Sequence, residues 1–575
     1  MITLGIAGLA HDAAAAVVED GRVRFALEEE RVTRRKNQWG FPFESCRAAL
    51  AMCGLTPRDI DRVAFYWDDR AALIPAVLSE LRGALDVRRP TLARIVRRWK
   101  AVGSNRLVRQ ALQEIWKNGA LPPIDFVDHH LAHALYAHRS SGFERALSVV
   151  IDGRGEYASL TVYRCDADRV SCIQRVAMPS SLGFVYGAVT QHLGFHPAAD
   201  EYRVMGLASF GQQDSALDRF FAALLPITPN GFKVNLHYTR YQHAESTDRR
   251  WLSEAVDTVL GPPRHRDGPI ESRHADIARA LQSRYEEVVL RILSGLARQD
   301  PGLPLTLSGG CAMNSVCNGR IFRESGFRDF FVPPAPGDQG AAIGAAFRGF
   351  SFRETARHVE FNRRAQVGPR YTREEVEHAV QARGLSPEQN KDPRARVIDL
   401  LCQGKVGAVF YGALEFGPRA LGGRSILADA RRADMKDRVN SKVKFREQFR
   451  PFAAAILRER TREYTGHDFR SDYMNLVMPL LSSKRAVVPA VVHEDGSCRF
   501  QTVCDLSDSV LRDLLRRFDE RTGVPMLLNT SFNVNGEPIV MSPADAINCY
   551  LGTDIDFLLM EDVLLCKAAA LESQC

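Results

Sequence analysis

Several features that would place a chain in a familiar class are absent from these 575 residues. No apolar run approaches the roughly 18 residues that a membrane-spanning helix needs, so we expect no membrane partner. The twelve cysteines are scattered and form no CxxC pair, which argues against a cysteine-based zinc site or a disulfide framework. Scattered thiols suit a reducing compartment, and we expect a cytoplasmic location.

A strong charge of one sign is also missing. The formal net charge of +7 is small for this length, so it suits anionic small-molecule substrates and gives no reason to expect nucleic acid. The opening residues MITLGIAGLAHDAAAAVVEDG carry no basic leader, and we expect a first strand there instead of a signal peptide. At roughly 100–200 residues per domain, two or three domains are expected.

The motif DHHLAHA at residues 128–134 organises the first half of the chain. It follows an apolar run at 124–127 that predicts a strand, and Asp128 is placed to cap a helix. On that helix His129 and His133 leave the same face one turn apart, as two nitrogen ligands of one metal ion do. The alternative is a pair of hydrogen-bonded core histidines. The pair therefore needs carboxylates from elsewhere to become a site.

Two aspartates at the ends of predicted elements supply such carboxylates. Asp152 follows a β-branched strand and opens DGRGE, whose glycines permit close approach to a phosphate or metal; an ordinary hairpin turn is the alternative. Asp338 follows the loop PPAPG, at the N-terminus of a predicted helix. Two imidazoles plus carboxylates suit a transition metal, and we prefer Fe(II), with Mn(II) or Zn(II) as alternatives.

A strand, a polar turn and a return strand occur twice in the first half, at 3–7 with 13–18 and at 146–151 with 158–163. One such unit is a weak signal, but two fit a duplicated actin-like domain whose turns face a nucleotide phosphate. His11 lies in the first turn, where a surface-loop histidine is the ordinary interpretation.

Glycine-containing turns in the same half suit a nucleotide. Gly206 lies in VMGLA, and the motif SGGCAMN contains Gly309, Gly310 and Asn314 at a predicted strand-to-helix turn. Small residues at such a turn allow the backbone to approach phosphates closely, so we expect these four residues to contact ATP. Residues 70–117 are helical in pattern and rich in arginine; they could contact RNA, but a solvated amphipathic insertion is the preferred interpretation.

Residues 351–395 begin charged and poorly periodic, so we place a linker at 356–395, between domains at 1–355 and 396–575. The second domain carries five cations on loops flanked by glycine, proline and aromatic residues: Arg419, Arg424, Lys444, Arg446 and Arg450. Arginine forks and a lysine point charge suit a phosphorylated substrate. Surface cations paired with nearby acids are the alternative.

These motifs, in this order, resemble the O-carbamoyltransferase family of the NodU and CmcH type. The resemblance covers nearly the whole chain and includes HDAAA, EEERVTRRKN, DHHLAHA, DGRGE, VPPAPGDQGAA, EFGPRALGGRSIL, VKFREQFRPF and LNTSFNVNGEPIV. It implies an α/β (α+β overall) protein. The first domain would be TsaD-like, in the actin-like superfamily, and the second YrdC-like.

The resemblance also implies a reaction. The second domain would use carbamoyl phosphate and Mg-ATP to make a carbamoyl-adenylate, and the first would transfer the carbamoyl group to a hydroxyl of a small-molecule natural product. Position by position, His129, His133, Asp152 and Asp338 match the metal ligands and His11 the general base. The carbamoyl-phosphate and nucleotide pocket would comprise Arg419, Arg424, Lys444, Arg446, Arg450, Asn529 and Ser531.

Two alternatives are kept beside this hypothesis. A tRNA threonylcarbamoyl transferase is favoured by the TsaD-like half and the basic insertion, although such systems usually keep the two activities on separate chains. An actin-like nucleotide switch would leave the cations of the second half unexplained. The acceptor is left open, and a homodimer is the expectation for a two-domain enzyme of this size.

Overall fold

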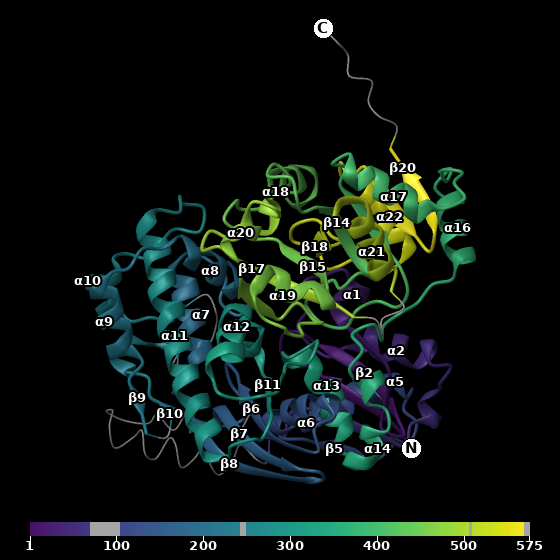
Figure 1. The fold of residues 1–575 in the computed structure, drawn as a ribbon. Coiled ribbons are helices and arrows are strands. Elements are labelled where there is room, and N and C mark those ends of the chain that lie inside the picture. Colours follow the sequence, from purple (N-terminus) through teal and green to yellow (C-terminus); the bar gives the residue numbers. More distant parts are fainter. Residues whose placement is uncertain (70–103, 230, 242–248, 505–508, 568–575) are drawn as a thin grey trace. The chain divides into compact units, whose positions relative to one another are not determined.

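The structure is a computed structural model that describes residues 1–69, 104–229, 231–241, 249–504 and 509–567. The chain divides into two compact units, whose elements Figure 1 labels. Unit 1 comprises Met1–Thr33 and Asn37–Arg364, and unit 2 comprises Arg34–Lys36 and Ala365–Cys575. The short segment Arg34–Lys36 thus belongs to unit 2, although unit 1 flanks it in the sequence.

Unit 1 contains two five-stranded sheets. The first has the order β3-β2-β1-β4-β5, with strands Arg22–Glu28, Ala14–Glu19, Ile2–Ala7, Arg62–Phe65 and Ile124–Phe126. The second has the order β8-β7-β6-β11-β12, with strands Arg169–Ala177, Ala158–Asp166, Arg145–Ile151, Leu305–Ser308 and Phe330–Phe331. In each sheet the first three strands pair antiparallel and the last two are added in parallel. The repeated strand order confirms the predicted duplication and the actin-like fold class.

Helices α6 (His129–Ser141) and α13 (Asp338–Phe347) pack against each other, α13 on β1 and β2 and α6 on β6 and β11 (Figure 1). Gly344 makes this packing possible, because a Cβ at this position would lie 1.8 Å from the carbonyl oxygen of Ala132 in α6. The close approach brings the N-terminus of α13, with Asp338, to the face of α6 that carries the two predicted histidine ligands.

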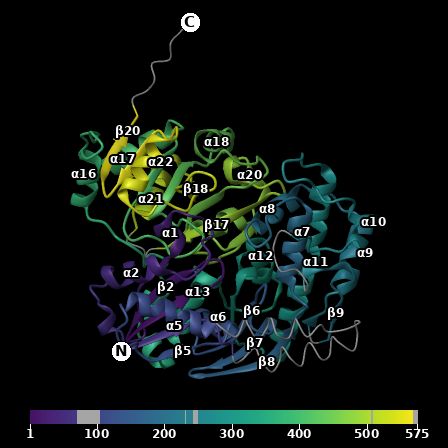
Figure 2. The ribbon, with the colours of Figure 1, turned by 180° about the vertical axis from the view of Figure 1, so that it is seen from behind.

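The other helices of unit 1 cover these sheets or form a helical group around α11 (Figure 1 and Figure 2). They include α1 (Glu29–Thr33), α2 (Phe43–Met52), α5 (Ser104–Ile115), α7 (Leu182–His192), α8 (Glu201–Leu207), α9 (Ser215–Leu224), α10 (Asp257–Leu260), α11 (Ser272–Gln299) and α12 (Ser315–Glu324). Of the predicted insertion at 70–117, residues 70–103 lie outside the described residues, and α5 buries Val108 and Leu112 on one face.

The stretch that the sequence predicts to be a linker contains helical segments separated by turns and extended backbone. It contains α15 (Val359–Asn362) and α16 (Arg373–Gln381), and α14 (Phe352–Ala356) precedes it. Capping boxes that join Ser351 to Glu354 and Thr372 to Glu375 start two of these helices despite their weak hydrophobic periodicity. Unit 1 ends and unit 2 resumes between Arg364 and Ala365, within the same stretch.

Unit 2 is built on one eight-stranded mixed sheet of order β16-β17-β15-β18-β14-β13-β19-β20. In that order the strands are Leu476–Pro479, Ser497–Val503, Ala453–Leu457, Met526–Ser531, Arg424–Asp429, Gly407–Phe410, Phe557–Met560 and Val563–Cys566. Its main helices are α17 (Pro393–Cys402), α18 (Met435–Val439), α19 (Thr461–Thr465), α20 (Ser482–Arg485), α21 (Val510–Thr522) and α22 (Pro543–Leu551). Ser542 caps α22 and Pro543 opens it.

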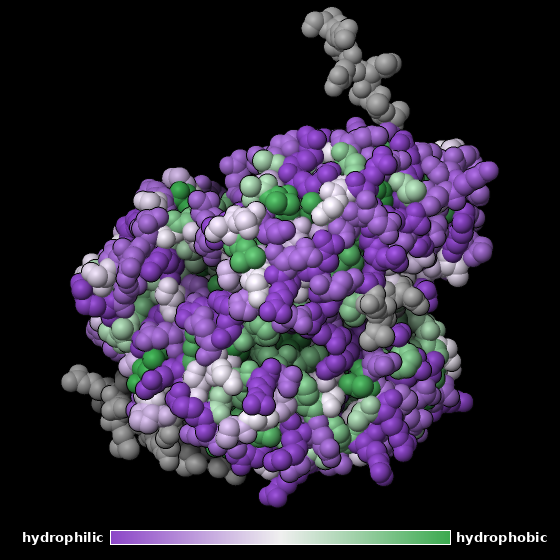
Figure 3. Space-filling view, in the orientation of Figure 1, coloured by the Kyte–Doolittle hydropathy of each residue, from purple (hydrophilic) through white to green (hydrophobic). Residues whose placement is uncertain are grey.

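The face seen in Figure 3 is mostly hydrophilic, and its hydrophobic side chains occur in small groups. Within the described ranges, no helix has both the length and the apolar character required to cross a bilayer.

Candidate active site

The histidine helix of unit 1 forms as its sequence predicts. Strand β5 ends before Asp128, whose carboxylate accepts the Leu131 N–H at 2.8 Å and caps α6. Gly142 ends the helix in the left-handed region, at φ 73°. Because they are four residues apart, the side chains of His129 and His133 lie on one buried face of the helix.

The structure brings all four predicted metal ligands together. His129 Nε2 lies 2.9 Å from Asp152 Oδ2 and 3.2 Å from His133 Nε2. His133 Nε2 lies 3.5 Å from Asp152 Oδ2, and both imidazoles lie 3.6 Å from Asp338 Oδ1. One donor atom from each residue therefore falls in a group whose members all lie within 4.8 Å of one another.

This group fits a divalent transition-metal ion. Ligands at about 2.0–2.2 Å from one ion are separated from each other by roughly 3.0–3.5 Å in tetrahedral or octahedral geometry. The observed separations of 2.9–3.6 Å span that range. Two imidazole nitrogens and two carboxylate oxygens are also a donor set that Fe(II), Mn(II) and Zn(II) accept.

The protonation states of these four side chains depend on one another. Burial lowers the pKa of His133, but hydrogen bonds to Asp152 and Asp338 and their negative charge raise it to about 9. The same carboxylates raise the pKa of His129 against its burial. In turn, burial raises the pKa of Asp152, while hydrogen bonds from the two histidines hold it well below its usual range. A cation at the centre would replace these shared protons.

Backbone N–H groups orient the Asp152 carboxylate. Its Oδ1 accepts from Gly153 N at 2.8 Å and from Gly310 N at 3.1 Å. Gly309 has φ 89°, and a Cβ there would lie 2.3 Å from the carbonyl oxygen of Ile151. Gly310, which is predicted to contact a nucleotide, thus orients a predicted metal ligand.

The other two residues predicted to contact ATP lie in helical contexts. Gly206 is buried in α8. Asn314 caps α12 by accepting the Cys317 N–H at 3.0 Å, and it exchanges hydrogen bonds with Gln282. The Asn314 amide is therefore committed to the fold.

His11 lies in a strained turn between β1 and β2. Leu9 and Asp12 flank it with φ of 67° and 58°, a conformation that residues other than glycine rarely adopt. His11 Nδ1 lies 3.0 Å from Asp12 Oδ2, and its side chain is about one-third exposed. Burial lowers the pKa of His11, but Asp12, Asp338 and Asp152 raise it to about 10. The nearby carboxylates therefore favour the protonated form of this imidazole.

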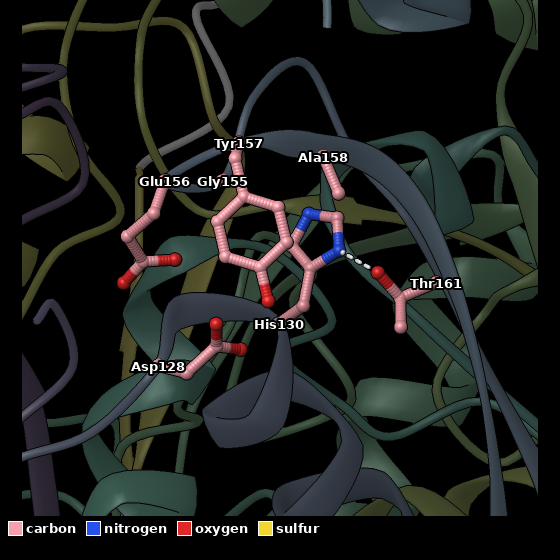
Figure 4. Close-up of a pocket in the computed structure, with 7 residues that line it drawn as sticks. All are labelled: Asp128, His130, Gly155, Glu156, Tyr157, Ala158 and Thr161. Carbon is pink, nitrogen blue, oxygen red and sulfur yellow. Dashed lines mark hydrogen bonds between the residues drawn. The ribbon is translucent and has the colours of Figure 1, made fainter. Parts of the chain in front are cut away.

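A small pocket beside the start of α6 contains a carboxylate that the sequence did not single out (Figure 4). Glu156 Oε1 accepts the N–H groups of His129 and Asp68, at 2.9 and 3.0 Å. On the other side, His130 Nδ1 lies 2.8 Å from Thr161 Oγ1, and burial lowers the pKa of His130 to about 3. The predicted metal ligands do not line this pocket.

In unit 2, Lys444 is the centre of the predicted phosphate pocket. Its ammonium group is buried within 3.2 Å of Ser531 Oγ, 3.0 Å of the Asn533 carbonyl and 2.8 Å of Asn533 Oδ1. Burial lowers its pKa well below the usual range, and the charges of Arg446, Arg450 and Lys36 lower it further. The positive charges near Lys444 therefore disfavour its protonated form.

Arg499 in β17 belongs to the same group, although the sequence did not identify it. Burial lowers the pKa of Arg499 well below its usual range, and Arg419, Arg446 and Arg450 lower it further. Its Nε is buried without a hydrogen-bond partner among the described residues. An anion among these arginines would relieve their mutual repulsion.

Two other predicted pocket residues are fully buried. Arg424 is fully buried, with its guanidinium 3.5 Å over the Phe410 ring and its Nη1 donating to the carbonyl groups of Tyr411 and Gly412. Asn529 is fully buried and donates to Gln501 Oε1 at 2.6 Å. Both side chains make contacts within unit 2, and their place in the phosphate pocket stays a prediction.

Both halves of the chain match known protein families. The carbamoyltransferase N-terminus model matches residues 2–347, and the carbamoyltransferase C-terminus model matches residues 398–567. The nodulation protein NolNO of Sinorhizobium fredii is 35% identical over 574 residues, covering 97% of this chain and 79% of that protein. The nodulation protein U of the same species is 30% identical, covering 94% and 95%.

Similarity to solved structures is more distant. Component A of the (R)-2-hydroxyglutaryl-CoA dehydratase of Acidaminococcus fermentans covers 62% of this chain and 99% of its own, with 13% identity and a TM-score of 0.33. Full-length HypF in its phosphate- and nucleotide-bound form covers 60% and 55%, with 15% identity and a TM-score of 0.30. The two family models, matched in order along one chain, show that the protein belongs to the carbamoyltransferase family.

Proposed function

We propose that this carbamoyltransferase works through a carbamoyl-adenylate, made in unit 2 and consumed in unit 1. The observation that carries the proposal is the group of arginines around the buried Lys444. Its members repel one another, and anions such as carbamoyl phosphate and the triphosphate of Mg-ATP would neutralise them.

The first half-reaction forms the carbamoyl-adenylate in two steps. Water cleaves carbamoyl phosphate to carbamate and inorganic phosphate. A carbamate oxygen then attacks the α-phosphorus of ATP, and pyrophosphate leaves. Lys444, Arg450 and Arg499 supply positive charge where the leaving phosphates carry their negative charge. This step needs no acceptor alcohol, so it can be measured alone.

The second half-reaction uses unit 1. The acceptor hydroxyl oxygen forms a bond to the carbamoyl carbon, AMP leaves, and the hydroxyl proton passes to His11. Asp12 holds Nδ1 of His11, so Nε2 is the nitrogen that takes the proton. A divalent ion held by His129, His133, Asp152 and Asp338 would polarise the carbamoyl oxygen and offset the negative charge that raises the pKa of His11.

The acceptor in this proposal is a hydroxyl of a small-molecule natural product. His11 is partly exposed, and the indole of Trp39, 62% exposed, packs edge-on against it with ring centroids 5.8 Å apart. This arrangement leaves the base accessible beside an aromatic surface. The basic run that would favour tRNA lies mostly in residues 70–103, outside the described residues, so we propose no nucleic-acid acceptor.

The two half-reactions give the test. Exchange of labelled pyrophosphate into ATP, dependent on carbamoyl phosphate, reports the first; mass spectrometry of carbamoylated acceptor reports the second. His11→Ala should retain exchange and lower transfer by about 10²–10⁴-fold. Lys444→Met should abolish exchange, while the exposed His265 serves as a control in His265→Ala. Loss of exchange in His11→Ala would contradict the separate roles.

A further inference from the structure

Phe445 has an unusual position in unit 2. It follows Lys444 and precedes Arg446, and its side chain is 63% exposed while that of Lys444 is almost completely buried. An exposed phenylalanine beside a buried lysine in a cationic pocket is not explained by core packing. The backbone conformation of Phe445 is unusual as well.

The backbone of Phe445 is strained. Residues Asn440–Lys444 form a π-helical turn, which the Phe445 N–H closes by donating to the Asn440 carbonyl at 2.8 Å. Phe445 itself has φ 44° and ψ 49°, in the left-handed region that favours glycine or asparagine. Short π-helical turns and bulky residues in this region are both concentrated at functional sites.

The neighbours of Phe445 explain how this strain is maintained. Lys444 is anchored inward on Ser531 and Asn533. Arg446 is held by its carbonyl, which accepts from Asn440 Nδ2 at 3.0 Å, and by its guanidinium, 4.2 Å over the Phe452 ring. Both neighbours of Phe445 are therefore held by the protein, and the left-handed residue between them exposes its aromatic ring.

We propose that Phe445 is the stacking surface for the nucleobase of the ATP that unit 2 uses. This inference rests on the proposed function, which places the triphosphate on the adjacent cations. In a nucleotide, one ribose joins the charged phosphate chain to a flat apolar base. The Lys444-Phe445-Arg446 segment likewise has an exposed aromatic ring next to two cations. Binding would cover the ring and give a reason for a phenylalanine where glycine would relax the backbone.

The test separates the ring from the backbone. Stacking of one base on an aromatic side chain corresponds to roughly five- to 150-fold in affinity. Phe445→Ala and Phe445→Gly should raise the KM for ATP in pyrophosphate exchange by that factor and leave the KM for carbamoyl phosphate within about twofold. Phe445→Gly should also keep or raise the thermal midpoint, because glycine removes the strain. Phe445→Tyr should behave as wild type.

Inorganic tripolyphosphate supplies the matched ligand, because it has the charge without the base. Its inhibition constant against exchange should be the same in wild type and Phe445→Ala. Leu551→Ala, at an exposed leucine of the same unit, is the control variant. An unchanged KM for ATP in Phe445→Ala would overturn the inference and leave the proposed function intact. Equal losses for ATP, carbamoyl phosphate and tripolyphosphate would show a structural role and also overturn it.

A failure of the proposed function has a different signature. If wild type shows no exchange, Phe445→Trp provides a direct probe of the same position. Quenching of the added indole by ATP, but not by tripolyphosphate, would support stacking without adenylate chemistry. No quenching would overturn the inference as well.

Discussion

The backbone N–H of His129 donates to both carboxylate oxygens of Glu156, at 2.9 and 3.1 Å. The first N–H groups of a helix lack intrahelical partners, and the helix dipole favours negative charge at this end. Oε1 of Glu156 also accepts from Asp68. Glu156 therefore ties the start of α6, which carries the predicted metal ligand His129, to the DGRGE loop, which carries the predicted ligand Asp152.

Removing Glu156 should loosen the metal centre without removing a ligand. We expect Glu156→Ala to weaken binding of the metal alone by about 10–100-fold, the range typical of residues that orient metal ligands. Cobalt(II) absorption measures both the affinity and the ligand geometry. Glu144→Ala, at an exposed glutamate beyond the other end of α6, is the control. An unaltered cobalt spectrum and affinity in folded Glu156→Ala would rule out this positioning role.

Glu156 should also reduce stability at neutral and higher pH. Burial raises its pKa to about 7, and Asp128 adds to the rise. An acid with a folded pKa above its unfolded value binds more protons when folded, so the free energy of unfolding falls as pH rises from about 4.5 to 7. Glu156→Gln should therefore gain stability over wild type at pH 8 and lose that gain at pH 4. Denaturant titrations at the two pH values measure it, and an equal gain at both would contradict the charge argument.

The contact between α13 and α6 makes a second prediction. Gly344→Ala places a Cβ against the Ala132 carbonyl, so the helices must separate. We expect a loss of about 1–3 kcal/mol in the free energy of unfolding, with weaker metal binding because Asp338 moves with α13. Gly295→Ala is the matched control: Gly295 lies in α11 with open space around its Cβ position, and alanine there should stabilise the helix. Equal effects of the two substitutions would contradict the packing argument.

The sequence predicted that His129, His133, Asp152 and Asp338 come together because each lies at the end of a clearly marked element. His129 and His133 can be placed without tertiary information, because they follow an apolar run and an N-cap and are four residues apart. Asp152 and Asp338 follow apolar strands, and duplicated sheets bring strand ends together. The predicted ligand set therefore depends on local patterns and one topological rule.

Other residues could not be predicted in this way because their roles arise from long-range contacts. Arg424 and Arg450 both lie beside glycine or proline in sequence, but only the structure shows Arg424 stacked on Phe410 in the core. Arg499 lies in a strand that reads as an ordinary buried segment, and its charge is informative only once Arg419 and Arg446 surround it. The left-handed φ of Phe445 also leaves no mark in the sequence.

The raised pKa of His11 predicts how transfer depends on pH. A base must be neutral, so the transfer rate should fall on the acidic side of the pKa of His11. Asp12 raises that pKa, and Asp12→Asn should shift the acidic limb to lower pH. Binding of the metal should shift the imidazole NMR titration of His11 in the same direction. A limb that does not move in Asp12→Asn would show that another group takes the proton.

Arg499 should lower the stability of the ligand-free protein and raise its affinity for carbamoyl phosphate. Three arginines lower its pKa, so Arg499→Met removes repulsion and should raise the thermal midpoint of the ligand-free protein. The same change should raise the KM for carbamoyl phosphate by roughly 10–150-fold, the value of a hydrogen bond to a charged group. Arg431→Met is the opposite control, because Arg431 pairs with Asp429 at 2.8 Å and its removal should lower the midpoint while sparing the KM. A destabilised Arg499→Met with an unchanged KM would show that Arg499 is a structural cation, and the anion pocket would then comprise only Lys444 and its loop arginines.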